Sequence, residues 1–401
     1  MSNTSRSFSI HGQGLKLHSR ADIEPHLECL KSMKDVEEVH FGGNSLGVEA
    51  CQAVAEVLDG LHNLKVADFA DVFTGRLITE IPVALTAICN ALKNKTSLVE
   101  LDLSDNAFGG RSAEPMVQFL THNRTFQVLK LNNNGLGPSG GTTVANALLE
   151  SARLSKAEGK LSNLRTVVCG RNRLQDDSAP LFAEAFAAHG NLVEVKMPQN
   201  GIRMDGIAAL AAGLSKCPSL QIVDLQDNCA KGRGTRALAK ALPFWPDLRQ
   251  LNLSECLLGG QAGIALAMSL NRGSSPKLET LRLQLGELDH RSLSILAKAI
   301  HDHLPLLTTL EINANRADPE DQCITDIREA LKTHGHEDAL DELDEMEEFE
   351  EEEEEEEEEK GAEEEEEEEE GREPEIKSAV EDKEADDLAA LMGKVSLSGN
   401  S

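Results

Sequence analysis

Aromatic residues are scarce in this chain of 401 residues. Tyrosine is absent, tryptophan occurs once, and all aromatic residues together make up 3% of the sequence. Proteins that hold single-stranded nucleic acid stack its bases on aromatic side chains, so this composition argues against such a platform. The formal net charge of −31 further disfavours contact with a polyanion. We therefore expect no nucleic acid among the partners.

Paired cysteines and long apolar runs are also missing. The eight cysteines show neither a C-x-x-C pair nor metal-ligand spacing, which is typical of small buried residues in a reducing compartment. No apolar run approaches the roughly 18 residues of a membrane-spanning helix, and no N-terminal signal peptide is recognisable. The sequence predicts a soluble, intracellular protein without a membrane segment, and leaves nuclear shuttling or perinuclear enrichment open.

Motifs for catalysis and nucleotide binding do not occur. The chain has no G-x-x-x-x-G-K-[ST] phosphate loop, and its twelve histidines are scattered without a serine, aspartate or cysteine partner at a coherent spacing. We therefore expect no metal site, no cofactor and no nucleotide site of its own, so that the chain is not an enzyme by itself.

What the sequence does contain is a repeat. Ten windows follow L-x-x-L-x-L-x-x-N-x-L with substitutions, and their spacings are 28, 34, 28, 38, 28, 28, 28, 30 and 29 residues. They begin at Val36, Leu64, Leu98, Phe126, Leu164, Leu192, Leu220, Leu248, Leu278 and Leu307. This is the leucine-rich-repeat signature, one strand and one helix per unit. It predicts an α/β solenoid, a crescent with the 28–29-residue period of ribonuclease-inhibitor-like repeats.

Both ends of the predicted solenoid carry capping segments, because each repeat leaves an apolar face for a neighbour to cover. Residues 8–15 match four pattern positions and predict an eleventh, N-terminal unit, and 324–331 predict the start of a C-terminal cap helix. We therefore assign residues 1–334 to one leucine-rich-repeat domain.

The repeat register sorts neighbouring polar residues. The asparagine at position 9 is expected to turn into the coil and bond backbone groups, which makes Asn134 structural. Asn133, at position 8, is expected on the rim, and Asn132 on the concave strand. Arg171 and Arg173 flank the structural asparagine of the next repeat. The alternative for these exposed residues is an ordinary solvated face.

Two units exceed the period, and departures from a repeat are where function is usually added. In the unit after Leu64, Val72 replaces the structural asparagine and a longer loop leaves Arg76 exposed beside a glycine, which favours a functional loop. In the unit after Phe126, the polar insertion 155–160 is expected to extend one rim as tolerated length.

An acidic tail follows the repeats. Residues 335–401 have a net charge of −28, whereas the preceding residues have a net charge of only −3. Glutamate runs of this kind repel themselves and are expected to stay disordered. A basic protein partner and a merely solubilising role both remain open for this tail.

Several of these motifs together resemble one family over nearly the whole chain and in the same order. The motifs are residues 73–76 (FTGR) with 80–82 (EIP), 103–109 (LSDNAFG), 133–138 (NNGLGP), 169–174 (CGRNRL) and 225–228 (LQDN). They are similar to the Ran GTPase-activating proteins, and the acidic tail fits that family as well. The chain is expected to be of the fungal type, without the C-terminal SUMO-acceptor domain of animal members.

The resemblance implies an activity and its partners. The chain would stimulate hydrolysis of Ran-bound GTP to GDP in the cytoplasm and so sustain the Ran gradient for nucleocytoplasmic transport. The partners would be Ran·GTP and a Ran-binding protein in a ternary complex, with the chain itself a monomer. Ran would bind the GTP and the magnesium ion, so no cofactor belongs to this chain.

The resemblance also assigns the site. Chemistry alone nominates Arg76 as an arginine finger, because a guanidinium matches phosphate oxygens. The family implies instead that Asn133 orients Ran's catalytic glutamine, while Arg76 holds Ran outside the phosphate site. Five further residues are expected to bind the partner: Asp105, Asn106, Asn132, Arg171 and Arg173. Of these, Asn106 is structural according to the repeat register.

Two other functions fit parts of this sequence. A non-catalytic leucine-rich-repeat protein that binds or inhibits a basic partner fits the period, but leaves the loop that ends in Arg76 unexplained. An acidic histone-binding nuclear protein has a similar tail but fewer and shorter repeats.

Overall fold

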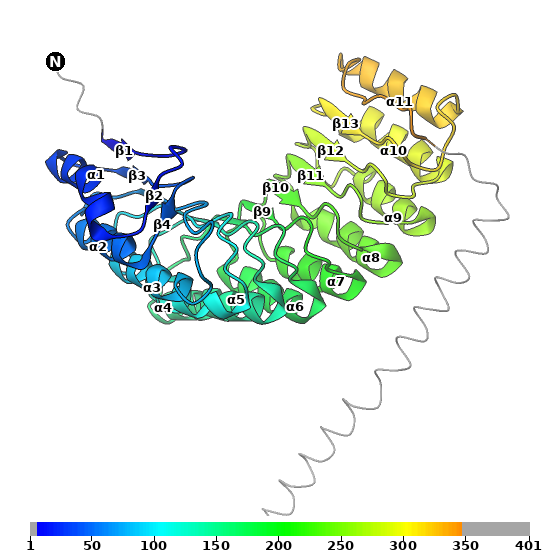
Figure 1. Cartoon of the computed structure of the whole chain (residues 1–401). Helices are drawn as coiled ribbons and strands as arrows, with labels where there is room; N and C mark the ends of the chain where they lie inside the picture. Colours follow the sequence, from blue (N-terminus) through cyan, green and yellow to red (C-terminus); the bar gives the residue numbers. More distant parts are fainter. Residues whose placement is uncertain (1–5, 347–401) are drawn as a thin grey trace, which may run out of the picture. The chain divides into compact units, whose positions relative to one another are not determined.

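The computed structural model describes residues 6–346 of the chain, and these residues form a curved solenoid (Figure 1). Its strands are β1 (Ser7–Ser9), β2 (Lys16–Leu17), β3 (Glu38–His40), β4 (Ser45–Leu46), β5 (Val66–Asp68), β6 (Glu100–Asp102), β7 (Val128–Lys130), β8 (Thr166–Val168), β9 (Glu194–Lys196), β10 (Ile222–Asp224), β11 (Gln250–Asn252), β12 (Thr280–Arg282) and β13 (Thr309–Glu311). Its helices are α1 (Arg20–Ser32), α2 (Val48–Asp59), α3 (Ile81–Leu92), α4 (Glu114–His122), α5 (Gly137–Ala157), α6 (Gln175–His189), α7 (Met204–Leu214), α8 (Lys231–Ala241), α9 (Gly260–Leu270), α10 (His290–His303) and α11 (Gln322–Thr333), with short 3-10 helices at Gly110–Ser112 and Leu242–Phe244.

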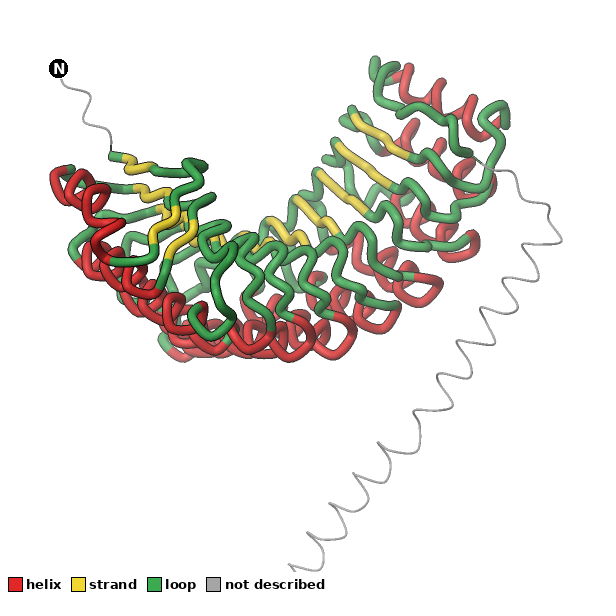
Figure 2. Tube along the Cα trace, viewed as in Figure 1, coloured by secondary structure: helices red, strands yellow, loops and turns green. Residues whose placement is uncertain are grey.

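The strands line the concave face and the helices line the convex face of the solenoid (Figure 2). Eleven strands form one parallel sheet in the order β1, β3, β5 and then β6 to β13, while β2 and β4 form a second, two-stranded sheet. Every predicted window places its strand at pattern positions 3 to 5, and the N-terminal fragment supplies β1. The predicted leucine-rich-repeat solenoid and its eleventh, N-terminal unit are therefore confirmed.

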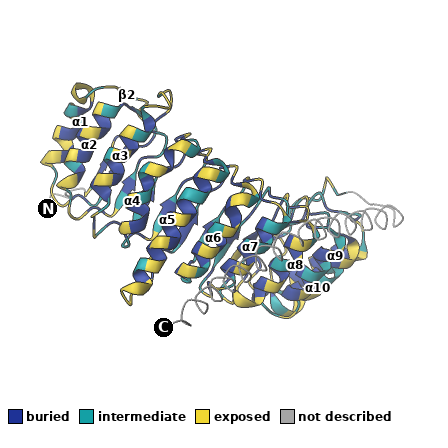
Figure 3. Ribbon diagram, turned by 90° about the horizontal axis from the view of Figure 1, so that it is seen from below, coloured by how far each residue is buried: buried dark blue, intermediate teal, exposed yellow. Residues whose placement is uncertain are grey.

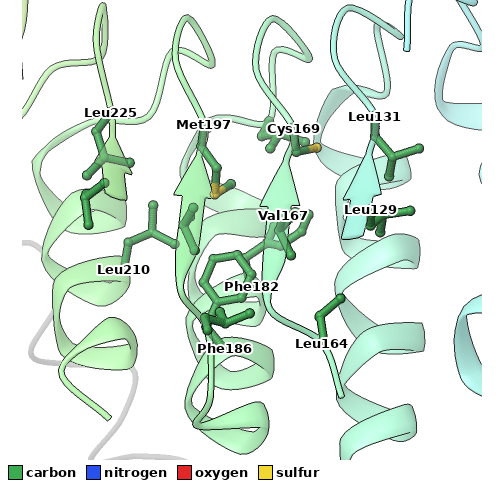
Figure 4. Packing of buried hydrophobic residues seen from close by; sticks show 14 of the residues in the cluster. Leu129, Leu131, Leu164, Val167, Cys169, Phe182, Phe186, Met197, Leu210 and Leu225 are labelled. Atoms are coloured by element: carbon green, nitrogen blue, oxygen red, sulfur yellow. The ribbon is translucent and has the colours of Figure 1, made fainter. Parts of the chain in front are cut away.

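The apolar pattern positions build one continuous core between the sheet and the helices (Figure 4). In the unit of β6, Leu98, Leu101, Leu103 and Phe108 are fully buried. The helices turn a buried stripe inward and an exposed one outward, as Figure 3 shows. Burying one such leucine stabilises the fold by about 1.5–3 kcal/mol, so regular spacing of these residues determines where each coil lies.

The asparagines at position 9 form a ladder inside the turns. Asn134 donates from Nδ2 to the carbonyl oxygens of Leu103 and Leu131, each at 3.0 Å, and its Oδ1 accepts the backbone N–H of Asn106 at 2.9 Å. The structural role that the register predicts for this position is confirmed. Buried asparagines lie at the same position of six further units: Asn44, Asn106, Asn172, Asn200, Asn228 and Asn315.

The second long unit lengthens a helix. Residues 155–157 of the polar insertion are the last residues of α5, which reaches 21 residues, and Glu158 pairs with Arg124 and Lys160 on the surface. This insertion extends the rim at which the strands begin, as expected.

The packed part of the chain continues beyond residue 334. Leu310 donates its backbone N–H to the Ala339 carbonyl at 2.7 Å, and Asp341 donates back to the Leu310 carbonyl at 3.0 Å, so this segment covers the free edge of β13. Leu340, Leu343 and Met346 pack against the core. The packed segment thus extends to residue 346 within the described residues, beyond the predicted boundary at 334. The remaining predicted tail, 347–401, lies outside the described residues.

Two truncations test this cap. A chain that ends after residue 334 is expected to lose on the order of 3 kcal/mol of stability in its last repeats, because the edge of β13 and the apolar surface beneath the cap become exposed. A chain that ends after residue 346 should unfold in urea like the full chain. Equal urea midpoints for the two truncated chains would contradict a capping role for 335–346.

A buried histidine makes stability depend on pH. Burial lowers the pKa of His189 to about 4, from 6.5, and its Nδ1 lies 2.5 Å from Ser162 Oγ. As the pH falls, the imidazole of the unfolded chain is therefore protonated before that of the folded chain. The contribution of neutral His189 to stability is fully present above pH 6.5 and is lost as the pH falls to about 4. The decrease attributable to this group is on the order of 3 kcal/mol. Urea unfolding at both ends of this range should show a smaller decrease for His189→Gln than for the wild type, and equal decreases would contradict the assignment.

Candidate functional site

The turns that follow the strands stand side by side along one edge of the solenoid, which we call the turn rim. Their position-8 residues all have positive φ, between 48° and 72°. The reason is a bond between coils, since the N–H at this position donates to the next turn, as from Asn133 to the Gly170 carbonyl at 2.9 Å. These residues are Gly43, Asp71, Asp105, Asn133, Arg171, Gln199, Asp227, Glu255, Leu285 and Ala314. Asparagine and aspartate tolerate this backbone better than most residues.

Asn133 follows β7 and is exposed on the turn rim, as predicted. Its Nδ2 donates to Oδ1 of Asp105, the position-8 residue of the preceding unit, at 2.9 Å. Because a carboxylate oxygen only accepts, this bond sets the orientation of the amide and turns its carbonyl oxygen away from Asp105. Asp105, predicted to bind the partner, therefore orients Asn133.

Asn132 lies half-buried at the edge of the concave face. Its Oδ1 accepts the backbone N–H of Gly170 at 2.6 Å, and its own N–H donates to Ser104 Oγ at 3.2 Å. The side chain and the backbone N–H of Asn132 thus link its coil to the two adjacent coils. Among residues 6–346 the side-chain NH₂ group of Asn132 has no acceptor, so it can donate to a partner.

Asn106 does not fit the predicted role in partner binding. Its side chain is 1% exposed, because it is the position-9 asparagine of its turn. Its Oδ1 accepts the N–H groups of Val72 and Phe73 at 2.8 and 3.2 Å. The bond from Val72 is the same ladder bond that Asn134 makes to Asn106, so Asn106 continues the ladder into the irregular unit and holds the base of the inserted loop.

Arg76 is turned back onto the solenoid instead of standing free. The loop of residues 69–80 joins β5 to α3, and Arg76 within it is partly buried. Its Nε donates to Ser45 Oγ at 2.9 Å, and one Nη donates to the Ser45 carbonyl at 2.6 Å. The other Nη lies 2.9 Å from His18 Nδ1. Sequence reasoning missed Ser45 and His18, which lie 31 and 58 residues away.

Arg171 and Arg173 are exposed on the turn rim, in the coil after Asn133. Both have left-handed backbone, with φ of 55° and 56°, on either side of the buried Asn172. In residues 6–346 neither guanidinium takes part in a hydrogen bond or ion pair within the chain. The two cations are therefore available to acidic groups of a partner.

The concave face beside Asn132 is a shallow polar hollow. It is lined by residues that include Glu100, Asp102, Lys130, Asn132, Thr166 and Lys196. Burial raises the pKa of Asp102. Burial alone would lower the pKa of Lys130, but its hydrogen bond to Glu100 and the nearby carboxylates raise it. The charges in this hollow are thus largely paired with each other.

Chemistry carried by the chain itself is not apparent in the described part. No group of histidine, cysteine, aspartate and glutamate there could hold a metal ion. Burial raises the pKa of Cys51, Cys89, Cys169 and Cys256 to about 12, so these thiols stay protonated. No helix among these residues is long and apolar enough to cross a membrane.

These features define a leucine-rich-repeat protein whose candidate site is a turn rim. The leucine-rich repeat family model matches residues 94–117 and 122–145. The chain is 35% identical to Ran GTPase-activating protein 1 of Saccharomyces cerevisiae over 326 residues, 79% of this chain and 80% of that protein. It therefore belongs to the family of Ran GTPase-activating proteins.

Animal relatives are longer than the region they share with this chain. Ran GTPase-activating protein 1 of Xenopus laevis is 44% identical over 199 residues, which are 49% of this chain and 34% of that protein. Ran GTPase-activating protein 2 of Caenorhabditis elegans is 40% identical over 203 residues, 50% of this chain and 21% of that protein. The chain thus spans about a third or less of these two relatives.

Proposed function

We propose that this chain stimulates hydrolysis of GTP bound to the small GTPase Ran, the activity that the names of its relatives state. Ran would supply the nucleotide, the magnesium ion and the catalytic glutamine. The observation that carries this proposal is the exposed amide of Asn133, oriented by Asp105 on the turn rim. The proposal needs only a surface that completes a partner's active site.

The mechanism follows from the donor and acceptor arrangement. A GTPase alone is slow because its attacking water is poorly positioned. Asn133 uses one amide N–H on Asp105, and its Oδ1 faces outward as an acceptor. When that oxygen accepts an N–H of the partner's glutamine amide, the glutamine carbonyl is left to accept a hydrogen from the attacking water. An activating protein that fixes the geometry of the attack supplies about 10³–10⁵ in rate, or roughly 4–7 kcal/mol of barrier.

The arginines have separate roles in this proposal. Arg76 would have to leave Ser45 and His18 in order to act as an arginine finger. Arg171 and Arg173 are exposed one coil from Asn133, and we infer that they bind acidic side chains of Ran. Exposed ion pairs at an interface rim mainly raise the association rate and are weakened by salt.

Single-turnover hydrolysis of Ran-bound GTP tests the proposal. Saturating full-length chain is expected to accelerate phosphate release by about 10³–10⁵-fold. Ran in which the catalytic glutamine is replaced by leucine should bind the chain but gain little rate, because Asn133 then has no amide to orient. No acceleration of wild-type Ran would overturn the proposal. Tight binding without acceleration would favour the non-catalytic binding protein instead.

A further inference from the structure

We propose that Arg76 is a positioning residue: it fastens the inserted loop to the first two coils, so that Leu77 and Ile78 form an apolar contact patch for the GTPase. The inference rests on the proposed function and deepens it. It assigns the partner contact in this region to the two apolar side chains and not to the guanidinium beside them.

The hydrogen bonds of Arg76 have the geometry of an internal clamp. The guanidinium can only donate, and it reaches four acceptors: Ser45 Oγ, the Ser45 carbonyl, His18 Nδ1 and, at 3.4 Å, the Leu17 carbonyl. The Ser45 hydroxyl in turn donates to the Thr74 carbonyl at 2.8 Å, within the same loop. These acceptors belong to β2, β4 and the turn before α1, so the loop is joined to two preceding coils.

The residues held next to Arg76 are apolar and face solvent. Leu77 is 66% exposed and Ile78 is 59% exposed, and Val83 in the first turn of α3 is 49% exposed. The backbone around them is fixed as well, because the Leu77 N–H donates to Glu80 Oε2 at 3.4 Å. Apolar side chains gathered on a held loop are the kind of feature that forms the centre of a protein interface.

Continuity with Asn133 identifies the occupant of this patch. The Phe73 ring at the base of the loop lies 6.1 Å from the Phe108 ring, in the unit that carries Asp105. Asp105 in turn binds Asn133. Neighbouring strands lie about 4.8 Å apart, so β5 is about 10 Å from β7, and the two earlier coils that Arg76 reaches are about 15–20 Å from β7. A GTPase interface that buries about 800 Å² on one partner is roughly 30 Å across, which is wide enough to cover both Asn133 and the loop that carries Leu77 and Ile78.

The decisive variant removes the two side-chain acceptors and keeps the arginine. In Ser45→Ala/His18→Ala the guanidinium keeps only its two backbone acceptors, and the Ser45 hydroxyl no longer binds the Thr74 carbonyl. The half-saturating concentration for Ran·GTP is expected to rise about 10-fold because the loop is held less firmly. Arg76→Ala should have a similar effect alone and add little in that background. If Arg76 touched the partner directly, loosening its bonds to the chain would leave affinity unchanged or improved, and Arg76→Ala would keep its full effect in that background.

The patch has its own test and a matched control. Leu77→Ser/Ile78→Ser should raise the half-saturating concentration about 10- to 100-fold with a maximal rate near that of the wild type. Leu285→Ser removes another apolar side chain, 50% exposed on a distant part of the turn rim, and should change neither quantity. Wild-type affinity in the Leu77→Ser/Ile78→Ser chain would overturn the assigned patch.

The clamp can be measured without Ran. Thermolysin cuts on the amino side of large apolar residues, and the clamp protects the bond before Leu77. Ser45→Ala/His18→Ala and Arg76→Ala should both be cut faster there than the wild type, whereas equal resistance would overturn the positioning role. If the wild type failed to accelerate GTP hydrolysis, the proposed function would be wrong. The rates of thermolysin cleavage would still show whether Arg76 holds the loop.

Discussion

Replacing Asn133 with alanine is expected to lower the maximal rate of Ran-bound GTP hydrolysis by about 100- to 1,000-fold, the effect of deleting one preorganised polar group at a reacting centre. The free energy of unfolding of the Asn133→Ala chain should stay within about 1 kcal/mol of that of the wild type. The side chain is exposed, and the main cost is that alanine must adopt the positive φ of 53° at this position. Single-turnover rates at saturating chain, together with urea unfolding, measure both quantities.

Asp105 supplies the control for this experiment. Asp105→Ala removes the acceptor that orients Asn133 and should lower the maximal rate about 10-fold, the share of the effect that orientation alone contributes. Asp105→Asn retains an oxygen that can accept the Asn133 N–H, so it should recover most of that rate. If Asn133→Ala raised the half-saturating concentration and left the maximal rate unchanged, Asn133 would be a binding contact only.

The fold could be predicted from the sequence because a repeat imposes the same packing on every unit. The position of a residue in the pattern determined whether it lies in the core, inside the turn or on the rim. This is why Asn134 and Asn133, adjacent in the chain, were assigned opposite environments correctly. The same register indicated that Asn106 is buried, against the role that family resemblance gave it.

The direction of Arg76 could not be predicted in this way. It depends on hydrogen bonds to Ser45 and His18, in other coils, and the pattern carries no information on contacts between loops. The C-terminal boundary was hidden for a different reason. Acidic residues dominate the composition after 334, although the three-residue spacing of Leu340, Leu343 and Met346 indicates a packed face.

The largest effect on stability is expected one residue from Asn133. Asn134→Ala should destabilise the solenoid by about 2–5 kcal/mol. It leaves the buried N–H of Asn106 without an acceptor, and it takes one of two side-chain donors from each of the Leu103 and Leu131 carbonyls. Each unsatisfied buried group costs about 1–3 kcal/mol. Urea denaturation followed by circular dichroism measures this loss.

Asn133→Ala is the matched control, since it makes the same substitution in the same turn on the exposed side. If both variants unfolded at the same urea concentration, the ladder inside the turns would contribute nothing to stability. Asn134→Ala should also lose activity, but only in proportion to the unfolded fraction, because the surviving folded molecules still present Asn133 on Asp105. Ran·GTP in excess, which binds only the folded chain, should therefore restore the activity of Asn134→Ala and leave Asn133→Ala inactive. That difference separates the residue that builds the turn from the residue that the turn presents.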